Sequence, residues 1–264
     1  MPLLYTQLSD FASLYGKPDQ LYFNRYYLSL AFKIYASRQH SKQKEMITMQ
    51  LIDSQTYVNL AKAYSGETQA RTRYEFVEYG MRNEGYTAMA EIVDTIAYQE
   101  FNHARMYYTF LQKASDKPIK NIEYSAGFPF KEKWTILDNL KFAAEDEHNE
   151  AKIYLAFAKT ARKEGFDDIA TLFEQTAAVE KIHESVFLEL YNQMKEGTLY
   201  KRDDPTTWVC SSCGYSATST EGWTECPLCK AKQGAILLHL KSLYSDDPLL
   251  LLSHKNNRPV VANA

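Results

Sequence analysis

The sequence predicts an all-α four-helix bundle followed by a small C-terminal metal-knuckle domain, mostly strand and loop. The first observation is an internal repeat, in which metal-ligand residue types recur 80 positions apart: Glu67 as Glu147, Glu100 as Glu180 and His103 as His183. A repeat of this length is one supersecondary unit used twice. The second observation is a pair of C-x-x-C motifs, Cys210 with Cys213 and Cys226 with Cys229.

Composition limits the class of protein. The 264 residues are 45% hydrophobic and 24% charged, with a net charge of -3, as is typical of one or two globular domains. There is no basic stripe, so no nucleic-acid partner is expected, and no run approaches the roughly 18 apolar residues of a membrane span. The N-terminus lacks the charged and apolar regions of a signal peptide. We therefore expect a cytoplasmic protein that does not act on a membrane.

Residues 1–50 are rich in tyrosine and phenylalanine. They predict a helical N-terminal extension whose aromatic side chains pack on a neighbouring element or on a second subunit.

Residues 51–200 predict the bundle. Apolar residues at helical spacing indicate helices at about 53–81, 87–114, 134–163 and 167–196. Ser54 is a suitable N-cap for the first helix, and Gly85 and Gly165 separate the helices within each pair. Short turns within the pairs and a long crossover at 114–133 between them describe a ferritin-like four-helix bundle.

The chain between Glu196 and Cys210 contains Gly197 and Pro205 and is expected to leave the bundle as a linker. Residues 205–240 then form the cysteine-bearing domain, and residues 241–264 are a C-terminal tail.

Each Glu-x-x-His motif places a carboxylate and an imidazole on one helix face, because residues three apart in a helix are neighbours. The motifs at 100–103 and 180–183 can therefore each offer both groups to a metal. With Glu67 and Glu147 from the other two helices, they make the pattern of a di-iron or di-manganese carboxylate centre. Carboxylates bridge two cations, and imidazole adds a terminal ligand that suits iron.

The third helix offers several acids. Glu147 is the repeat partner of Glu67, whereas Glu150 has no counterpart and lies one turn farther on. Glu150 is the candidate for a seventh ligand, which makes the two metals inequivalent. Asp146 and Glu145 are expected to point elsewhere.

A histidine and two tyrosines are also candidates for contact with the site. His148 is displaced by about 100 degrees around the helix from its neighbour Glu147, so it is not expected to touch a metal. Tyr74 and Tyr154 lie two turns beyond their glutamates and face the same interior. Their hydroxyls can hydrogen-bond and orient ligand carboxylates, and ordinary buried packing is the alternative.

The four cysteines, with twelve residues between the two pairs, predict one tetrahedral metal bound by thiolates. Spacing alone leaves zinc and iron open. The neighbouring residues favour iron, since Gly214 and Tyr215 follow the first pair and Pro227 lies inside the second.

Together these motifs resemble the rubrerythrin family, in which a ferritin-like di-iron domain precedes a rubredoxin-like FeS4 domain. The similar segments are YSGETQARTRYEF, IAYQEFNHA, EGFDDIA, AAVEKIHE, CSSCGY and CPLC, within residues 54–240. The resemblance implies that the four cysteines hold one iron. It implies two further iron ions with the ligands Glu67, Glu100, His103, Glu147, Glu150, Glu180 and His183.

The resemblance also implies an oxidoreductase that reduces hydrogen peroxide to water at the di-iron site. Electrons would pass through the FeS4 centre from an upstream donor, a reductase or a rubredoxin. A head-to-tail homodimer would set the FeS4 domain of one subunit beside the di-iron site of the other. The residues expected to take part in the reaction are Glu67, Glu150, Tyr74 and Tyr154.

The chain departs from the family pattern in its third helix. That helix typically reads E-x-x-E-x-x-x-M-Y, and here one residue is missing between Glu150 and Tyr154. A bulge is therefore expected to be absent, which leaves the pose of Glu150 open. Two other functions stay open, an iron-handling ferroxidase and a helical bundle with a structural zinc-ribbon binding module. Peroxide and dioxygen are not distinguished as oxidants.

Overall fold

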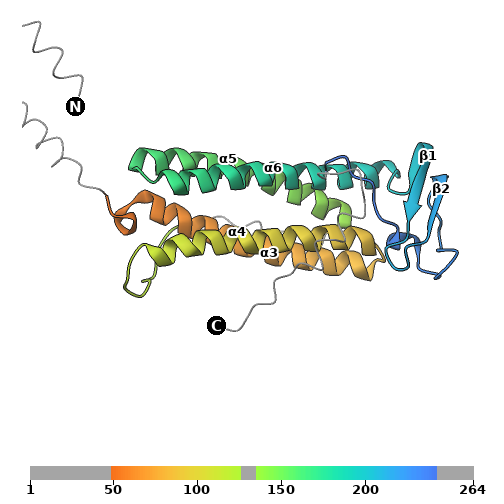
Figure 1. The fold of residues 1–264 in the computed structure, drawn as a ribbon, viewed down its shortest axis with the longest axis horizontal. Coiled ribbons are helices and arrows are strands. Elements are labelled where there is room, and N and C mark those ends of the chain that lie inside the picture. Colours follow the sequence, from red (N-terminus) through yellow and green to blue (C-terminus); the bar gives the residue numbers. More distant parts are fainter. Residues whose placement is uncertain (1–48, 126–134, 243–264) are drawn as a thin grey trace, which may run out of the picture. The chain divides into compact units, whose positions relative to one another are not determined.

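The computed structural model describes residues 49–125 and 135–242 (Figure 1). Its long helices are α3 (Gln55–Asn83), α4 (Thr87–Lys113), α5 (Ile136–Glu164) and α6 (Asp167–Glu196). They confirm the predicted four-helix bundle, with boundaries close to those expected. The predicted N-terminal extension, part of the crossover and almost all of the C-terminal tail lie outside the described residues.

The repeat is visible in the turns that join the helices of each pair. Gly85 and Gly165 have φ angles of +88° and +89°, a left-handed conformation that glycine adopts without a Cβ penalty. The amide of the next residue, Tyr86 or Phe166, donates to the carbonyl five residues earlier, at 2.9 and 2.8 Å. Both helices therefore end in the same Schellman motif.

The start of α3 ties the two helix pairs together. Ser54 Oγ accepts from the amide of Tyr57 at 3.0 Å, which confirms the predicted N-cap. Glu164, at the end of α5, accepts from the amides of Gln55 and Thr56 at 3.1 and 2.8 Å. A carboxylate at a helix N-terminus also interacts favourably with the helix dipole.

The buried apolar side chains form two clusters within the bundle. One contains Tyr74, Ile96 and Phe187, and the other contains Tyr107, Tyr154 and Phe173 among others. Six buried acidic and histidine side chains belong to neither cluster: Glu67, Glu100, His103, Glu147, Glu180 and His183. The hydrophobic core is thus interrupted by a charged layer.

The stretch that we expected to be a linker is mostly a strand. β1 (Lys201–Val209) pairs antiparallel with β2 (Ser216–Glu221), and the 3-10 turn η3 (Gln233–Ala235) follows. The β-branched and aromatic residues Thr206 to Val209 favour a strand. Pro205 is tolerated because the pairing register shifts between Lys201 and Thr206.

The cysteine-bearing region packs against the bundle. Its flanking residues Leu199, Leu238 and Leu240 belong to the same apolar cluster as Phe187. A Cβ atom added to Gly234 of η3 would lie 1.7 Å from the carbonyl oxygen of Gly85, so the two backbones touch. This contact holds η3 at the turn between α3 and α4.

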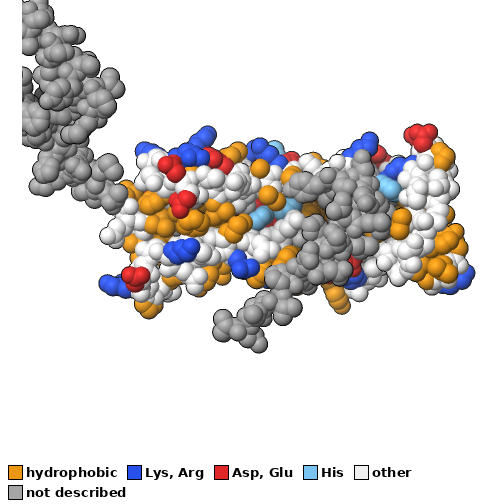
Figure 2. Space-filling model, viewed as in Figure 1, with side chains coloured by type: hydrophobic (Ala, Val, Ile, Leu, Met, Phe, Trp, Pro, Cys, Tyr) orange, Lys and Arg blue, Asp and Glu red, His pale blue; other side chains and the backbone are white. Residues whose placement is uncertain are grey.

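The face shown in Figure 2 carries interspersed basic and acidic side chains and hydrophobic patches over the bundle. Within residues 49–125 and 135–242, no helix has the length and apolar character needed to cross a membrane.

Candidate metal centres

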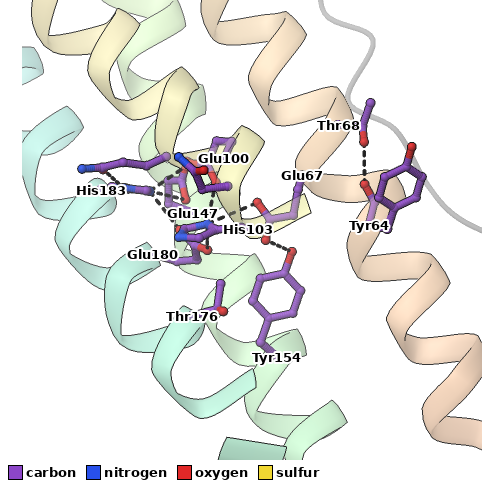
Figure 3. A network of polar contacts seen from close by, with 12 residues as sticks. Tyr64, Glu67, Thr68, Glu100, His103, Glu147, Tyr154, Thr176, Glu180 and His183 are labelled. Carbon is purple, nitrogen blue, oxygen red and sulfur yellow. Dashed lines mark hydrogen bonds and ion pairs between the residues drawn. The ribbon is translucent and has the colours of Figure 1, made fainter. Parts of the chain in front are cut away.

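The four long helices bring together two overlapping groups of ligand-type side chains (Figure 3). Within each group, one ligand atom from every residue lies within 4.8 Å of the others. Every member is less than a tenth exposed. One group is Glu67, Glu100, His103 and Glu180, and the other is Glu100, Glu147, Glu180 and His183.

Glu100 and Glu180 are shared because each directs one oxygen toward each histidine. From Glu100, Oε2 lies 3.0 Å from Nδ1 of His103, and Oε1 lies 2.9 Å from Nδ1 of His183. From Glu180, Oε1 lies 3.1 Å from Nδ1 of His103, and Oε2 lies 2.9 Å from Nδ1 of His183. Two carboxylates placed in this way would be able to bridge two cations.

Glu67 and Glu147 each approach one histidine only. Glu67 Oε2 is 3.5 Å from Nδ1 of His103, and Glu147 Oε2 is 3.7 Å from Nδ1 of His183. The two would therefore be terminal ligands, one for each cation, on opposite sides of the shared pair. Together the residues form the buried di-metal carboxylate site that the repeat predicted.

The unpaired atoms of this layer fit two bound cations. Buried carboxylate oxygens with no hydrogen-bond partner occur on each of the four glutamates: Glu67 Oε2, Glu100 Oε1, Glu147 Oε2 and both oxygens of Glu180. The layer holds four buried carboxylates and only two histidines. Negative charges left uncompensated there cost several kcal/mol each. Two cations among these atoms remove that cost, and an oxygen and nitrogen donor set suits iron or manganese.

Without cations, the layer retains protons. Burial and repulsion from Glu100 raise the pKa of Glu147 to about 8. Although burial opposes it, the surrounding carboxylates raise the pKa of His103 and His183 well above 6.5. Glu100 behaves oppositely: its pKa is lowered despite burial, because the two histidines favour the carboxylate. Metal ions must therefore displace protons from this site.

The two predicted tyrosines do bond ligand-type carboxylates, each across the bundle. Tyr154 on α5 donates to Oε1 of Glu67 on α3 at 2.6 Å. Tyr74 on α3 donates to Oε1 of Glu147 on α5. Each hydroxyl orients the terminal glutamate of the other helix pair.

Glu150 lies beside the cluster and is in neither four-residue group. The residue is half-buried, and its Oε2 atom is buried without a hydrogen-bond partner. The helix around it is regular α-helix from Ile136 to Glu164, in line with the missing residue. The structure therefore leaves Glu150 within the surroundings of the site without assigning it a metal.

The other acids of α5 and its histidine point elsewhere, as predicted. Asp146 pairs with Arg73 at 2.7 Å, and Glu145 approaches Lys141 at 3.8 Å. The half-exposed His148 pairs through Nδ1 with Glu184 at 3.0 Å.

Gln99 has a role that the sequence did not suggest. Its Oε1 lies 2.7 Å from Nε2 of His183. Because an amide oxygen only accepts, this bond keeps a proton on Nε2 and leaves Nδ1 for the carboxylate side. The repeat partner of Gln99 is Val179, so the repeat carried no signal for it. Arg73 was also missed, although it immediately precedes Tyr74 in the motif that resembles the family.

The four cysteines form the second site. Their thiols are free, and Sγ of Cys210 lies 3.8 Å from that of Cys229, while the Cys213 and Cys226 sulfurs are 3.7 Å apart. A disulfide needs about 2.05 Å. Metal–sulfur bonds of about 2.3 Å in a tetrahedron place sulfurs about 3.8 Å apart, so the spacing fits one metal ion.

Two equivalent backbone turns hold these sulfurs. The amide of Gly214 donates to the carbonyl of Cys210 at 2.9 Å, and that of Lys230 donates to the carbonyl of Cys226 at 3.0 Å. Although desolvation opposes it, the backbone amides of Cys229 and Leu228 lower the pKa of Cys226 to about 7. Such amide bonds favour the thiolate, the form that ligates a metal.

Three kinds of comparison relate this chain to known proteins. The family model described as rubrerythrin matches residues 59–137 and 138–209. A rubrerythrin of Clostridium perfringens is 37% identical over 177 residues, which cover 67% of this chain and 90% of that protein. A rubrerythrin of Porphyromonas gingivalis is 35% identical over 193 residues, covering 73% and 94%. A solved nigerythrin structure aligns at 26% identity with a TM-score of 0.47, over 70% of this chain and 90% of that one.

Proposed function

This chain belongs to the rubrerythrin family, and from that membership we propose that it is a non-haem di-iron peroxidase. It would reduce hydrogen peroxide to water with electrons relayed through iron in the four-cysteine site. The observation that carries the proposal is the sharing of Glu100 and Glu180 between His103 and His183. This arrangement suits two metal ions held side by side.

The reaction consumes one hydrogen peroxide, two electrons and two protons and yields two waters. Two iron ions held by the buried layer would supply the electrons and the Lewis acidity for cleaving the O–O bond. Tyr154 and Tyr74 hold the terminal carboxylates of Glu67 and Glu147 in place. Glu150 can hold a proton at Oε2, because burial and the charge of Glu147 raise the pKa of its carboxyl group.

Electrons reach the buried site through the four-cysteine site in this proposal. Cys213 and Cys229 are exposed, and Leu228 between the second pair of cysteines is 65% exposed. This surface is accessible to an upstream donor, a reductase or a rubredoxin. A thiolate-bound iron carries one electron at a time, so two transfers reload the di-iron pair.

We further propose a head-to-tail homodimer, since a path within one chain is long. The cysteine-bearing region packs at Gly85, before the start of α4. From Thr87 to Glu100 the helix rises about 20 Å. A second subunit would shorten the path, and α3 offers Phe76 and Tyr79, 72% and 67% exposed, as an apolar contact.

The test combines metal analysis with a single-turnover experiment. Protein purified without added metal should contain iron at all its metal positions and be red from thiolate-to-iron charge transfer. In anaerobically reduced protein, one equivalent of hydrogen peroxide should accept two electrons, the number that the di-iron site holds. A colourless protein with zinc in the cysteine site would instead indicate a structural zinc ribbon. A large cage that accumulates ferric mineral would indicate a ferroxidase.

A further inference from the structure

The di-metal site has one half with Glu67 and His103 and another with Glu147 and His183. The internal repeat pairs the residues of the two halves, so chemical differences between them can be identified position by position. Tyr107 on α4 corresponds to Phe187 on α6, and Thr176 on α6 corresponds to Ile96 on α4. All four side chains are at most 4% exposed. One half therefore carries two buried hydroxyls where the other half has only hydrocarbon.

These two hydroxyl residues lie on the same side of the charged layer. Tyr107 is one turn beyond His103 on α4, and Thr176 is one turn before Glu180 on α6. Since α4 and α6 run in opposite directions (Figure 1), both positions fall toward the same end of the bundle. Figure 3 shows Thr176 on the side of the carboxylates where Tyr154 lies.

Aromatic contacts place Tyr107 next to the Glu67 half. Its ring centroid lies 5.7 Å from that of Tyr154, whose hydroxyl bonds Glu67. On the other half, Phe187 packs in the same way on Tyr74, with centroids 5.0 Å apart. The packing of the two halves is alike, and the difference lies in the hydroxyl groups.

The Tyr107 hydroxyl is buried and makes no hydrogen bond of ordinary geometry among the residues that the structure describes. Burial raises its pKa and the neighbouring Thr176 hydroxyl lowers it, so the two hydroxyls lie close together. Leaving a buried polar group unpaired is unfavourable. The Thr176 hydroxyl donates to the carbonyl of Leu172 at 3.0 Å, which leaves its oxygen free to accept. The Tyr107 donor and the Thr176 acceptor thus remain available on this half.

We propose that Tyr107 and Thr176 position a small hydroxylic molecule, water or hydrogen peroxide, beside the Glu67 and His103 half of the site. Tyr107 donates to an oxygen of this molecule, and Thr176 Oγ1 accepts its proton in a hydrogen bond. A buried water needs two to four such partners. The opposite half, with Phe187 and Ile96, cannot hold the same molecule. The peroxide part of this inference rests on the proposed function.

The first test is structural and independent of activity. We would determine high-resolution crystal structures of the metal-loaded full chain, the Tyr107→Phe/Thr176→Val double variant and the control Ile96→Val. We expect an ordered water about 2.6–3.2 Å from both hydroxyls in the unmodified protein and in the control. This water should be missing from the double variant, and no such water should lie beside Phe187 in the opposite half of the site. An unmodified protein with no ordered molecule at either hydroxyl would overturn the inference.

The second test separates water from peroxide. Each of Tyr107→Phe and Thr176→Val should raise the KM for hydrogen peroxide about 10-fold, with kcat, metal content and Tm retained. The double variant should be little worse than either single variant, because both hydroxyls hold one molecule. Loss of the water without any change in KM would overturn the peroxide role. An equal rise in KM from Ile96→Val would show a packing effect and overturn it as well. An unmodified protein without peroxidase activity would refute the proposed function, and the crystallographic result would still decide the site.

Discussion

The hydroxyl of Tyr154 on α5 donates a 2.6 Å hydrogen bond to Oε1 of Glu67 on α3. Its repeat counterpart Tyr74 makes the mirrored bond to Glu147. Each helix pair therefore orients a carboxylate that belongs to the other pair. Each four-residue ligand group also draws on both helix pairs, so neither pair holds a complete group alone.

Replacing Tyr154 with Phe should weaken metal binding at the Glu67 position by about 10–100-fold, because the carboxylate loses its orienting bond. Stability should fall by about 1–3 kcal/mol, because a buried carboxylate oxygen loses its donor. Anaerobic metal titration followed by thermal unfolding measures both quantities. Tyr57→Phe is the matched control, since Tyr57 belongs to the same apolar cluster as Tyr154. Equal losses in the two variants would contradict an orienting role.

Replacing Glu180 with Gln should lower occupancy of both metal positions together, because this carboxylate faces both histidines. Peroxide turnover should fall with the metal content, which elemental analysis of the purified protein measures. Glu184→Gln is the control on the same helix, since Glu184 pairs with the half-exposed His148. A Glu180→Gln protein that keeps both metals and full turnover would show that the ligand assignment is wrong.

The acids of α5 should rank by their distance from the site. Glu147→Ala should impair metal binding most, since Glu147 approaches His183, whereas Asp146→Ala should chiefly lose the ion pair with Arg73. Glu150→Ala should keep at least one metal and slow turnover. Metal stoichiometry and stopped-flow reoxidation distinguish these outcomes. A loss in Asp146→Ala as severe as in Glu147→Ala would shift the repeat frame by one residue.

The metal-free protein should lose stability as pH rises. The pKa of Glu147 is about 8 in the folded chain against 4.5, and those of His103 and His183 lie well above 6.5. A group whose pKa is raised by folding stabilises below its unfolded pKa, and this contribution is lost as pH rises through the folded value. The lowered pKa of Glu100 has no effect above its unfolded value of 4.5.

We therefore expect the Tm of the metal-free protein to fall between about pH 5 and pH 9. The metal-loaded protein should show a flatter profile, because cations have replaced the protons. Scanning calorimetry of both forms in a series of buffers measures the difference. A metal-free Tm that rises steadily across this range would refute the charge arrangement described for the site.

Replacing Cys226 with Ser should spare di-metal loading and the reaction of pre-reduced protein with peroxide. It should abolish steady-state turnover driven by an external reductase, since the relay is broken. Ser212→Ala, within the first C-x-x-C motif, is the control. Subunit exchange with Glu180→Gln protein should restore partial activity if electrons cross a dimer. Verified heterodimers without activity would place the transfer within one chain.

The sequence by itself determined the bundle and most of the metal layer. Ligand-type residues that recur at a fixed offset on helices must face a shared interior, because helical periodicity and the repeat constrain both. The same logic identified the four-cysteine site, since the spacing of two C-x-x-C motifs leaves few geometries for four thiolates. The Schellman turns at Gly85 and Gly165 also follow from local residue preferences.

Only the tertiary structure decided which side chains of the two helix pairs contact each other across the bundle. Periodicity shows which way a side chain faces within its helix and does not show which partner it meets across the bundle. The crossed bonds of Tyr74 and Tyr154, the Gln99 bond to His183 and the strand in place of a linker depend on such long-range contacts. Tyr107 and Thr176 could be read in the sequence, but their placement beside Tyr154 and the Glu67 half of the site required the packed helices.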